Sequence, residues 1–280
     1  MIRVTLFVHL PEQEDYAEQW LWADGASSVS SKPPGHPDRS LEAMYDELDE
    51  VSFHARLEEA ARSWPGEVPP AATSEVDEKN WQVQWRENFT PLQAGRFRLV
   101  GEWEDLPADD DTIWIYPGQA FGTGQHETTR LVLEHMETIP FERARVLDIG
   151  CGTGILSIAA EKLGAAEVFG FDADPDCAEN MAHHLRINES RRIELSIGTL
   201  DDFSLASGSY DVVLANITLN VLREVWPLCK GLLKPKGHLI SSGILLEQKE
   251  EAEAQLHDLG FDIYRHTGLG EWVMLAARIS

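Results

Sequence analysis

From Arg145 onward the sequence alternates between short apolar runs and helical stretches, and this alternation limits the possible folds more than any other feature. Runs such as "RVLDIG", "EVFGFDA" and "YDVVLANI" are rich in β-branched and aromatic residues and have the length of buried strands. Stretches with helical periodicity, such as "PDCAENMAHHLRIN", separate most of them. Parallel strands are joined by crossover helices that cover both faces of the sheet. The sequence therefore predicts an α/β fold with a Rossmann-like, mostly parallel sheet.

The end of the chain departs from this alternation. A last helical stretch, "LEQKEEAEAQLHDLG", is followed by two strand-like runs, "FDIYRHT" and "EWVMLAARIS", with few residues between them. Strands joined by so short a connection pair antiparallel. We therefore expect an antiparallel hairpin at one edge of the sheet.

The first 80 residues have a different character and predict a separate small domain. Residues 1–65 contain three strand-like runs, "IRVTLFVHL", "ASSVS" and "VSFHA", and a helical stretch, "EDYAEQWLWADG", which together indicate a small α+β domain. Residues 66–80 are rich in Pro, Ala and acidic residues without periodicity, which is typical of a linker. Residues 81–280 are expected to form the second domain, which begins with Trp81 and Trp85 spaced as on one helical face.

The charge of the chain favours a basic partner over a nucleic acid. The 280 residues include 48 acidic side chains and 23 Lys or Arg, a net charge of -25, so the field repels phosphates and attracts basic proteins. We expect no direct readout of nucleic acid. No run of about 18 apolar residues and no signal-peptide pattern occurs, so we expect no membrane contact and a cytoplasmic location.

Neither a disulfide frame nor a metal site is expected. The three cysteines, Cys151, Cys177 and Cys229, lack C-x-x-C spacing and are expected to be small buried residues. His126 and Glu127 match the first two residues of the H-E-x-x-H zinc-binding pattern, but its second His is missing, so a metal site is not predicted.

A glycine-rich stretch, "VLDIGCGTG", ends the first strand of the alternating part. Asp148 closes the strand, and Gly150, Gly152 and Gly154 follow at every second position before a helix that starts near Ile155. Glycines let the backbone approach a ligand, and a helix N-terminus offers free N–H groups. A dinucleotide fingerprint needs G-x-G-x-x-G, which the isoleucine breaks. The spacing instead fits a ligand with an amino-acid tail and no pyrophosphate, S-adenosylmethionine.

Two further strand ends carry polar residues that suit a nucleoside. Asp172 ends the second strand, where a carboxylate can accept hydrogen bonds from both ribose hydroxyls. Thr199, in "GTLDD" at the end of the third strand, is expected to lie against the adenine edge. Each acid taken alone could also be a helix N-cap or a solvated turn residue. Their order along the chain favours a cofactor site.

Three motifs, "VLDIGCGTG", "FGFDADP" and "YDVVLANI", together resemble the class I S-adenosylmethionine-dependent methyltransferases. Three further stretches, "WQVQWRENFTPL", "AFGTGQHETTR" and "ANIT", narrow the resemblance to the ribosomal protein L11 methyltransferase family, over nearly the whole chain. The resemblance implies an enzyme that methylates lysine side chains and the N-terminal amine of large-subunit ribosomal protein L11. It also implies that the small N-terminal domain recognises this ribosomal substrate.

The resemblance assigns roles to particular positions. It implies that Gly150 lies beneath the methionine part of the cofactor and that Asn216 faces the reacting methyl group. Phe121 and Thr128 are expected to line the substrate cavity, in a loop that caps the cofactor, although without the resemblance this loop could be a turn with helix-start hydroxyls. With the glycine loop and the third strand included, the expected cofactor-binding residues are Thr129, Gly150, Gly152, Asp172, Thr199 and Asn216.

Asn216 is the expected catalytic residue. A neutral amine can attack the methyl group once a desolvated pocket has lowered the amine pKa, so no strong base is needed. The side-chain carbonyl of Asn216 can accept from the amine N–H and aim its lone pair, although on sequence alone a turn asparagine fits the pattern equally well. Methylation of a nucleic acid base or a glutamine amide is disfavoured, because Ile217 and Thr218 stand where that chemistry uses prolines. Two further hypotheses stay open on the sequence: a non-catalytic binding protein of this fold, and a methyltransferase that acts on another protein.

Overall fold

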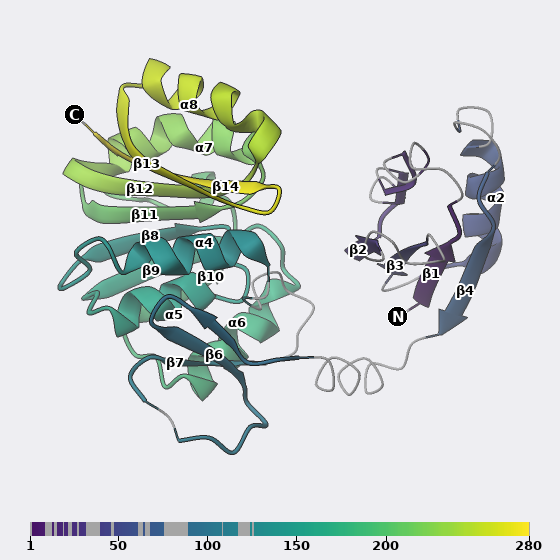
Figure 1. The fold of residues 1–280 in the computed structure, drawn as a ribbon, viewed down its shortest axis with the longest axis horizontal. Coiled ribbons are helices and arrows are strands. Elements are labelled where there is room, and N and C mark those ends of the chain that lie inside the picture. Colours follow the sequence, from purple (N-terminus) through teal and green to yellow (C-terminus); the bar gives the residue numbers. More distant parts are fainter. Residues whose placement is uncertain are drawn as a thin grey trace. The chain divides into compact units, whose positions relative to one another are not determined.

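A computed structural model describes residues 2–8, 13, 16–18, 20–21, 24–26, 28–31, 40–45, 48–60, 64, 68–75, 89–107, 109–116, 124 and 126–279. The chain divides into two compact units, Met1–Glu87 and Asn88–Ser280, each with its own sheet and hydrophobic core (Figure 1). Trp81 and Trp85, expected on one helical face, lie outside the described residues.

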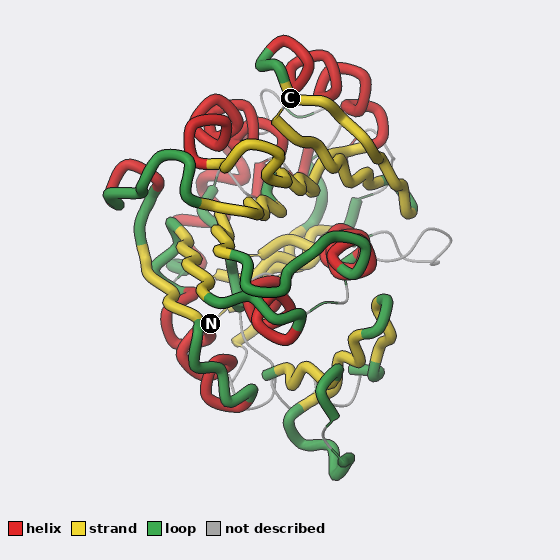
Figure 2. The backbone as a smooth tube through the Cα atoms, turned by 90° about the vertical axis from the view of Figure 1, so that its left-hand side faces the viewer, coloured by secondary structure: helices red, strands yellow, loops and turns green. Residues whose placement is uncertain are grey.

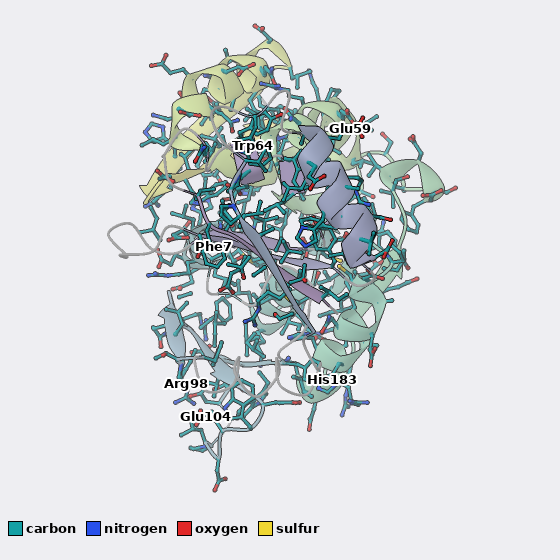
Figure 3. The ribbon with its side chains drawn as sticks, turned by 90° about the vertical axis from the view of Figure 1, so that its right-hand side faces the viewer. Phe7, Glu59, Trp64, Arg98, Glu104 and His183 are labelled. Atoms are coloured by element: carbon teal, nitrogen blue, oxygen red, sulfur yellow. The ribbon has the colours of Figure 1, made fainter. Side chains whose placement is uncertain are left out.

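The N-terminal unit contains a four-stranded antiparallel sheet with a helix packed on it. The order is β2-β3-β1-β4, with strands β1 (Ile2–Leu6), β2 (Ser28–Ser31), β3 (Leu41–Tyr45) and β4 (Ala71–Glu75). Helix α2 (Glu50–Ala60) places Phe53 and Leu57, four residues apart, in the core. Trp64, labelled in Figure 3, joins the same core and meets the ring of Trp20 edge-on.

The expected strand at residues 51–55 is wrong, because these residues lie in α2. Val51 is 79% exposed whereas Phe53 is fully buried, and residues two apart on a strand would share a face. The β-branched and aromatic side chains of this run suggested a strand, but packing against the sheet overrides that weak preference. The strand before α2 is instead β3, which the sequence interpretation missed.

The expected linker at residues 66–80 is also wrong in part, because it contains β4. This strand pairs with β1 along its whole length, from Ile2 opposite Glu75 to Leu6 opposite Ala71. It is an edge strand that pairs, among the described strands, only with β1, and its small and polar residues show no apolar alternation in the sequence.

The C-terminal unit contains a seven-stranded sheet in the order β10-β9-β8-β11-β12-β14-β13. Its strands are β8 (Arg145–Ile149), β9 (Glu167–Asp172), β10 (Ile193–Ile197), β11 (Tyr210–Asn216), β12 (Leu233–Leu245), β13 (Phe261–Leu269) and β14 (Trp272–Ile279). Strands β8 to β12 run parallel, and β13 and β14 form the expected antiparallel hairpin at the edge. The predicted α/β fold is confirmed.

Helices cover both faces of this sheet (Figures 1 and 2). They are α4 (Glu127–Met136), α5 (Ile155–Lys162), α6 (Cys177–Ile187), α7 (Leu219–Leu232) and α8 (Lys249–Asp258), with short 3-10 turns at η1 (Leu200–Asp202) and η2 (Leu246–Gln248). Right-handed crossovers change face where the strand order reverses, which happens at β8. Hence α5 and α6 lie on one face, and α4 contacts α5, whereas α7 lies on the other face and contacts α8. A crevice above such a reversal is the usual ligand site of an open α/β sheet.

A small sheet of order β5-β6-β7 precedes α4, with strands β5 (Leu92–Ala94), β6 (Phe97–Gly101) and β7 (Thr112–Ile115). Side chains at the end of α6 occupy the other edge of β7. Asn188 exchanges two hydrogen bonds of 2.8 and 2.9 Å with the backbone of Trp114, and Nε2 of His184 accepts from the Tyr116 N–H at 3.0 Å. Burial lowers the pKa of His184 to about 4, so near pH 7 its ring is a neutral acceptor.

Candidate active site

Three of the expected site residues end neighbouring parallel strands and share one edge of the sheet. Asp172 ends β9, Asn216 ends β11, and Gly150 directly follows β8 between them. In register, the last residue of β8 lies opposite Phe171 of β9 and Ala215 of β11. The reversal of strand order at β8 therefore brings the three residues together at its carboxyl end.

The loop after β8 requires glycine for two physical reasons. Gly150, Gly152 and Gly154 have φ angles of 67, 52 and 80°, in the left-handed region that other residues rarely adopt. A Cβ on Gly150 would also overlap Cγ2 of Ile217, and one on Gly154 would lie 2.6 Å from Cδ1 of Leu195. A side chain at Gly150 or Gly154 would therefore have to displace a neighbouring side chain.

The carboxylate of Asp172 holds this loop and keeps acceptor capacity. One oxygen accepts from the N–H of Gly152 at 2.8 Å, and the other accepts from the N–H of Asp174 at 3.0 Å. A carboxylate has about four lone-pair positions, so each oxygen can accept one more donor. Two adjacent hydroxyls of a ribose match that remaining capacity.

Two adjacent cavities lie along this edge. The first, here called the Asn216 cavity, has a volume of about 400 Å³, and the second, the Thr199 cavity, has a volume of about 460 Å³. They adjoin each other, because four residues line both: Gly150, Asp172, Ile217 and Val221. Thr128, Gly152 and Trp272 line only the Asn216 cavity.

The charged groups at both cavities are carboxylates. Asp172 and Asp174 line the Asn216 cavity, and Asp201 and Glu224 line the Thr199 cavity. No described lysine or arginine lines either one. This environment suits a cation such as a sulfonium and opposes a pyrophosphate. Together with the glycine loop and the carboxylate of Asp172, the donor set fits S-adenosylmethionine.

Asn216 lines the Asn216 cavity, and its side-chain oxygen is a hydrogen-bond acceptor without a described partner. Its residue is 8% exposed, its Nδ2 donates to Oγ1 of Thr129 at 3.3 Å, and its Oδ1 is buried with no partner among the described residues. An unsatisfied buried acceptor costs about 1–3 kcal/mol, so a ligand donor at this oxygen would be stabilised. Thr129 is fully buried and lines neither cavity, so it orients the Asn216 amide, and its direct contact with the cofactor stays a prediction.

The start of α4 supplies further lining residues of the Asn216 cavity. His126 caps the helix, and its Nδ1 accepts from the N–H of Thr128 at 3.3 Å and lies 2.8 Å from Oγ1 of the same residue. Burial lowers the pKa of His126, against an opposing effect of Glu127, so the ring is neutral near pH 7. Its ring meets Trp272 edge-on at a centroid distance of 4.9 Å. Trp272 is a site residue that the sequence did not reveal, because only the hairpin brings it to this edge.

Of the other expected residues, Thr199 lines the cavity named after it, and its hydroxyl donates to the carboxylate of Asp202 at 2.8 Å. Its expected contact with the adenine edge stays a prediction. Phe121 lies outside the described residues, so its expected place in the substrate cavity also stays a prediction.

The three cysteines are free and buried, as expected. Within the described part of the chain, no three or more His, Cys, Asp or Glu side chains gather in an arrangement that could hold a metal ion. Among the same residues, no helix has both the length and the apolar character needed to cross a membrane.

Asp148 is a buried acid directly before the glycine loop. It is fully buried, one carboxylate oxygen accepts from Oγ of Ser157 at 2.7 Å, and the other has no partner among the described residues. Burial raises the pKa of Asp148 to about 7, the charge of Asp172 adds to the shift, and the hydrogen bond from Ser157 opposes it. Asp148 is therefore partly protonated near neutral pH.

We predict that the free energy of unfolding depends on pH through Asp148, and that Asp148→Asn removes this dependence. The pKa of Asp148 is raised from 3.8 to about 7 in the folded state, so between these pH values the folded state binds a proton that the unfolded state does not bind. The free energy of unfolding therefore falls as the pH rises from about 4 to about 7. The pKa shift corresponds to a cost of about 4 kcal/mol for the buried charge at pH 8. Asp148→Asn removes this charge, but its amide NH2 also lacks a partner, so we expect a net stabilisation of about 2 kcal/mol at pH 8. Urea unfolding at pH 5 and pH 8 measures the effect. An unchanged pH dependence in the variant would refute it.

A doubly wound sheet that ends in an antiparallel hairpin, with a carboxylate-lined crevice where the strand order reverses, defines a class I S-adenosylmethionine-dependent methyltransferase. The sequence profile described as "Ribosomal protein L11 methyltransferase" matches residues 11–280. The chain therefore belongs to the ribosomal protein L11 methyltransferase family.

Individual relatives agree with this family. The ribosomal protein L11 methyltransferase of Chromohalobacter salexigens is 32% identical over 280 residues, which covers 92% of this chain and 90% of that protein. The one of Acetivibrio thermocellus is 36% identical over 208 residues, 73% of this chain and 66% of the relative. A crystal structure of the ribosomal protein L11 methylase of Lactobacillus delbrueckii subsp. bulgaricus has a TM-score of 0.63 at 30% identity, covering 69% of this chain and 100% of that chain. The resemblance inferred from the sequence motifs is confirmed.

Proposed function

We propose that this protein transfers methyl groups from S-adenosylmethionine to amine nitrogens of ribosomal protein L11, namely lysine side chains and the N-terminal amine. The observation that carries the proposal is the side-chain oxygen of Asn216, a buried acceptor without a described partner at a cavity that adjoins the Thr199 cavity and is lined by the carboxylates of Asp172 and Asp174. Such an acceptor suits an N–H donor rather than an oxyanion.

The roles of the cofactor-binding residues follow from the two cavities. Asp172 would accept from both ribose hydroxyls, with Thr199 beside the base in the Thr199 cavity. Gly150 and Gly152 would let the backbone approach the amino-acid tail in the Asn216 cavity. When bound, the cofactor supplies a sulfonium methyl, which is the electrophile.

The remaining residues of the Asn216 cavity would prepare the amine. Removal from water disfavours the ammonium form, so the amine pKa falls and the neutral nucleophile becomes accessible. Oδ1 of Asn216 would accept one amine N–H and aim the nitrogen lone pair at the methyl group, while Thr129 holds the amide through its Nδ2. The rings of Trp272 and His126 would exclude water beside the reacting nitrogen.

The partner would be a basic protein rather than a nucleic acid. The net charge of -25 attracts a lysine-rich surface and repels phosphates, which supports docking of a ribosomal protein without direct nucleic acid readout. We assign recognition of this substrate to the small N-terminal unit. A ribosomal protein substrate supports a cytoplasmic location for the reaction.

The reaction is tested by incubating the purified protein with methyl-labelled S-adenosylmethionine and purified L11. We expect label in L11, and peptide mass spectrometry should locate it on lysines and on the N-terminal amine. L11 with an acetylated N-terminus should lose the N-terminal label alone. An acidic protein of similar size is the matched control and should stay unlabelled. Cofactor binding by calorimetry without label in L11 would favour a non-catalytic binding protein.

A further inference from the structure

Ile217, the residue after Asn216, lies between two glycines that come from different strands. A Cβ on Gly150, after β8, would overlap Cγ2 of Ile217 and lie 3.7 Å from its Cβ. A Cβ on Gly243, in β12, would overlap the carbonyl oxygen of Ile217 and lie 2.8 Å from its carbonyl carbon and 3.2 Å from its nitrogen. One glycine therefore accommodates the side chain of Ile217 and the other accommodates its backbone.

The strand pairing explains why the second glycine is needed. Asn216 pairs with Ser242 in the parallel register of β11 and β12, and the N–H of Ile217 donates to the carbonyl of Ser242 at 3.2 Å. Gly243 follows with a φ of 82°, and the pairing of β12 with β14 shifts register between Ser241 and Ile244. The bulge at this point turns β12 beneath the backbone that follows Asn216.

Ile217 also stands at the junction of the two cavities. It lines both the Asn216 cavity and the Thr199 cavity, whereas Gly243 lines only the Asn216 cavity. Any displacement of Ile217 therefore moves the wall between the two cavities and the backbone that carries Asn216. A misplacement of about 1 Å at a reacting group can cost about 100-fold in rate.

We propose that Ile217, clamped between Gly150 and Gly243, is a positioning residue that sets where the Asn216 oxygen meets the acceptor nitrogen. The proposal rests on the proposed methyl transfer to amines. Gly243 lines only the Asn216 cavity, so a substitution there tests the Asn216 side of the clamp and adds no atom to the lining of the Thr199 cavity.

Gly243→Ala tests the clamp from the backbone side. We expect the turnover number with L11 to fall about tenfold or more, because relief of the overlap with the Ile217 backbone displaces the neighbouring Asn216, while the cofactor dissociation constant stays within about threefold. Gly208→Ala is the matched control: Gly208 also has a positive φ, of 60°, but a Cβ there meets nothing within 4 Å. Both variants should lose stability from the strained φ, and Gly243→Ala should lose more because of the backbone overlap, but only Gly243→Ala should lose turnover.

Ile217→Ala tests the clamp from the side-chain side and does not depend on whether Gly243→Ala folds. It should lower turnover about tenfold with little change in cofactor affinity, and Ile217→Val, which keeps both γ positions, should restore turnover to within about twofold of wild type. Turnover equal to wild type in both Gly243→Ala and Ile217→Ala would overturn the proposal. Equal losses of cofactor affinity and turnover would overturn it as well. A wild-type protein that does not methylate L11 would instead refute the proposed function.

Discussion

Asn216→Ala is expected to lower the turnover number for L11 methylation by about 100-fold or more, with the cofactor dissociation constant changed by less than about threefold. The substitution removes the acceptor that aims the amine lone pair, and this oxygen has no described partner to lose within the protein. Under the proposed function the lost interaction is the one with the reacting nitrogen, so the cofactor affinity should change little. Steady-state kinetics with L11 and calorimetry with S-adenosylmethionine measure the two quantities.

Asn220→Ala is the matched control for this variant. Asn220 is exposed on α7, four residues further along the chain, and its side-chain oxygen accepts from Arg223 at 3.2 Å. Its removal should leave turnover unchanged. Equal reductions of turnover and cofactor affinity in Asn216→Ala would show that Asn216 is only a binding residue.

Asp172→Ala is expected to weaken cofactor binding by about 100-fold or more. Two hydrogen bonds from ribose hydroxyls to a carboxylate are each worth about 1.5 kcal/mol or more, and 1.4 kcal/mol corresponds to tenfold in affinity. The variant also loses the acceptor for the N–H of Gly152, which loosens the glycine loop. Calorimetric titration with S-adenosylmethionine measures the loss directly.

Asp176→Ala is the corresponding control, since Asp176 is an exposed carboxylate of the same turn that lines neither cavity. It should bind the cofactor as wild type does. Asp172→Asn should fall between the two, because its amide keeps one oxygen acceptor but carries no charge. Wild-type affinity in Asp172→Ala would exclude the ribose as the group held at this position.

The parts of the fold that sequence patterns predicted are those with strong local signals. Strand β8, the glycine loop and α5 combine an apolar run, a required left-handed backbone and a helical period within one short segment. Strand β4 lacks such a signal, because its residues are small or polar and its place in the sheet comes from pairing with β1. Residues 51–55 carried a misleading signal, which packing in the core of the N-terminal unit overrode.

The residues of the candidate site also fall into those with a local sequence signal and those without one. Asp172 and Asn216 were identifiable because each ends a strand, and parallel strands end at one edge of the sheet. Trp272 had no local signal, since its place at the Asn216 cavity depends on how the terminal hairpin pairs with β12. The isolated glycine at position 243 was a usable signal, because glycine within a strand indicates a bulge or a close backbone contact.

By itself the sequence determined the alternation of strands and helices, the backbone freedom of the glycine loop, and the residues at the strand ends, because these depend on spacing and on local conformation. The tertiary structure alone decided that Ile217 lies between Gly150 and Gly243, that Asp148 is buried enough to hold a proton near pH 7, and that the two cavities adjoin each other. These properties arise from contacts between segments far apart in the chain, and local spacing carries no information about such contacts.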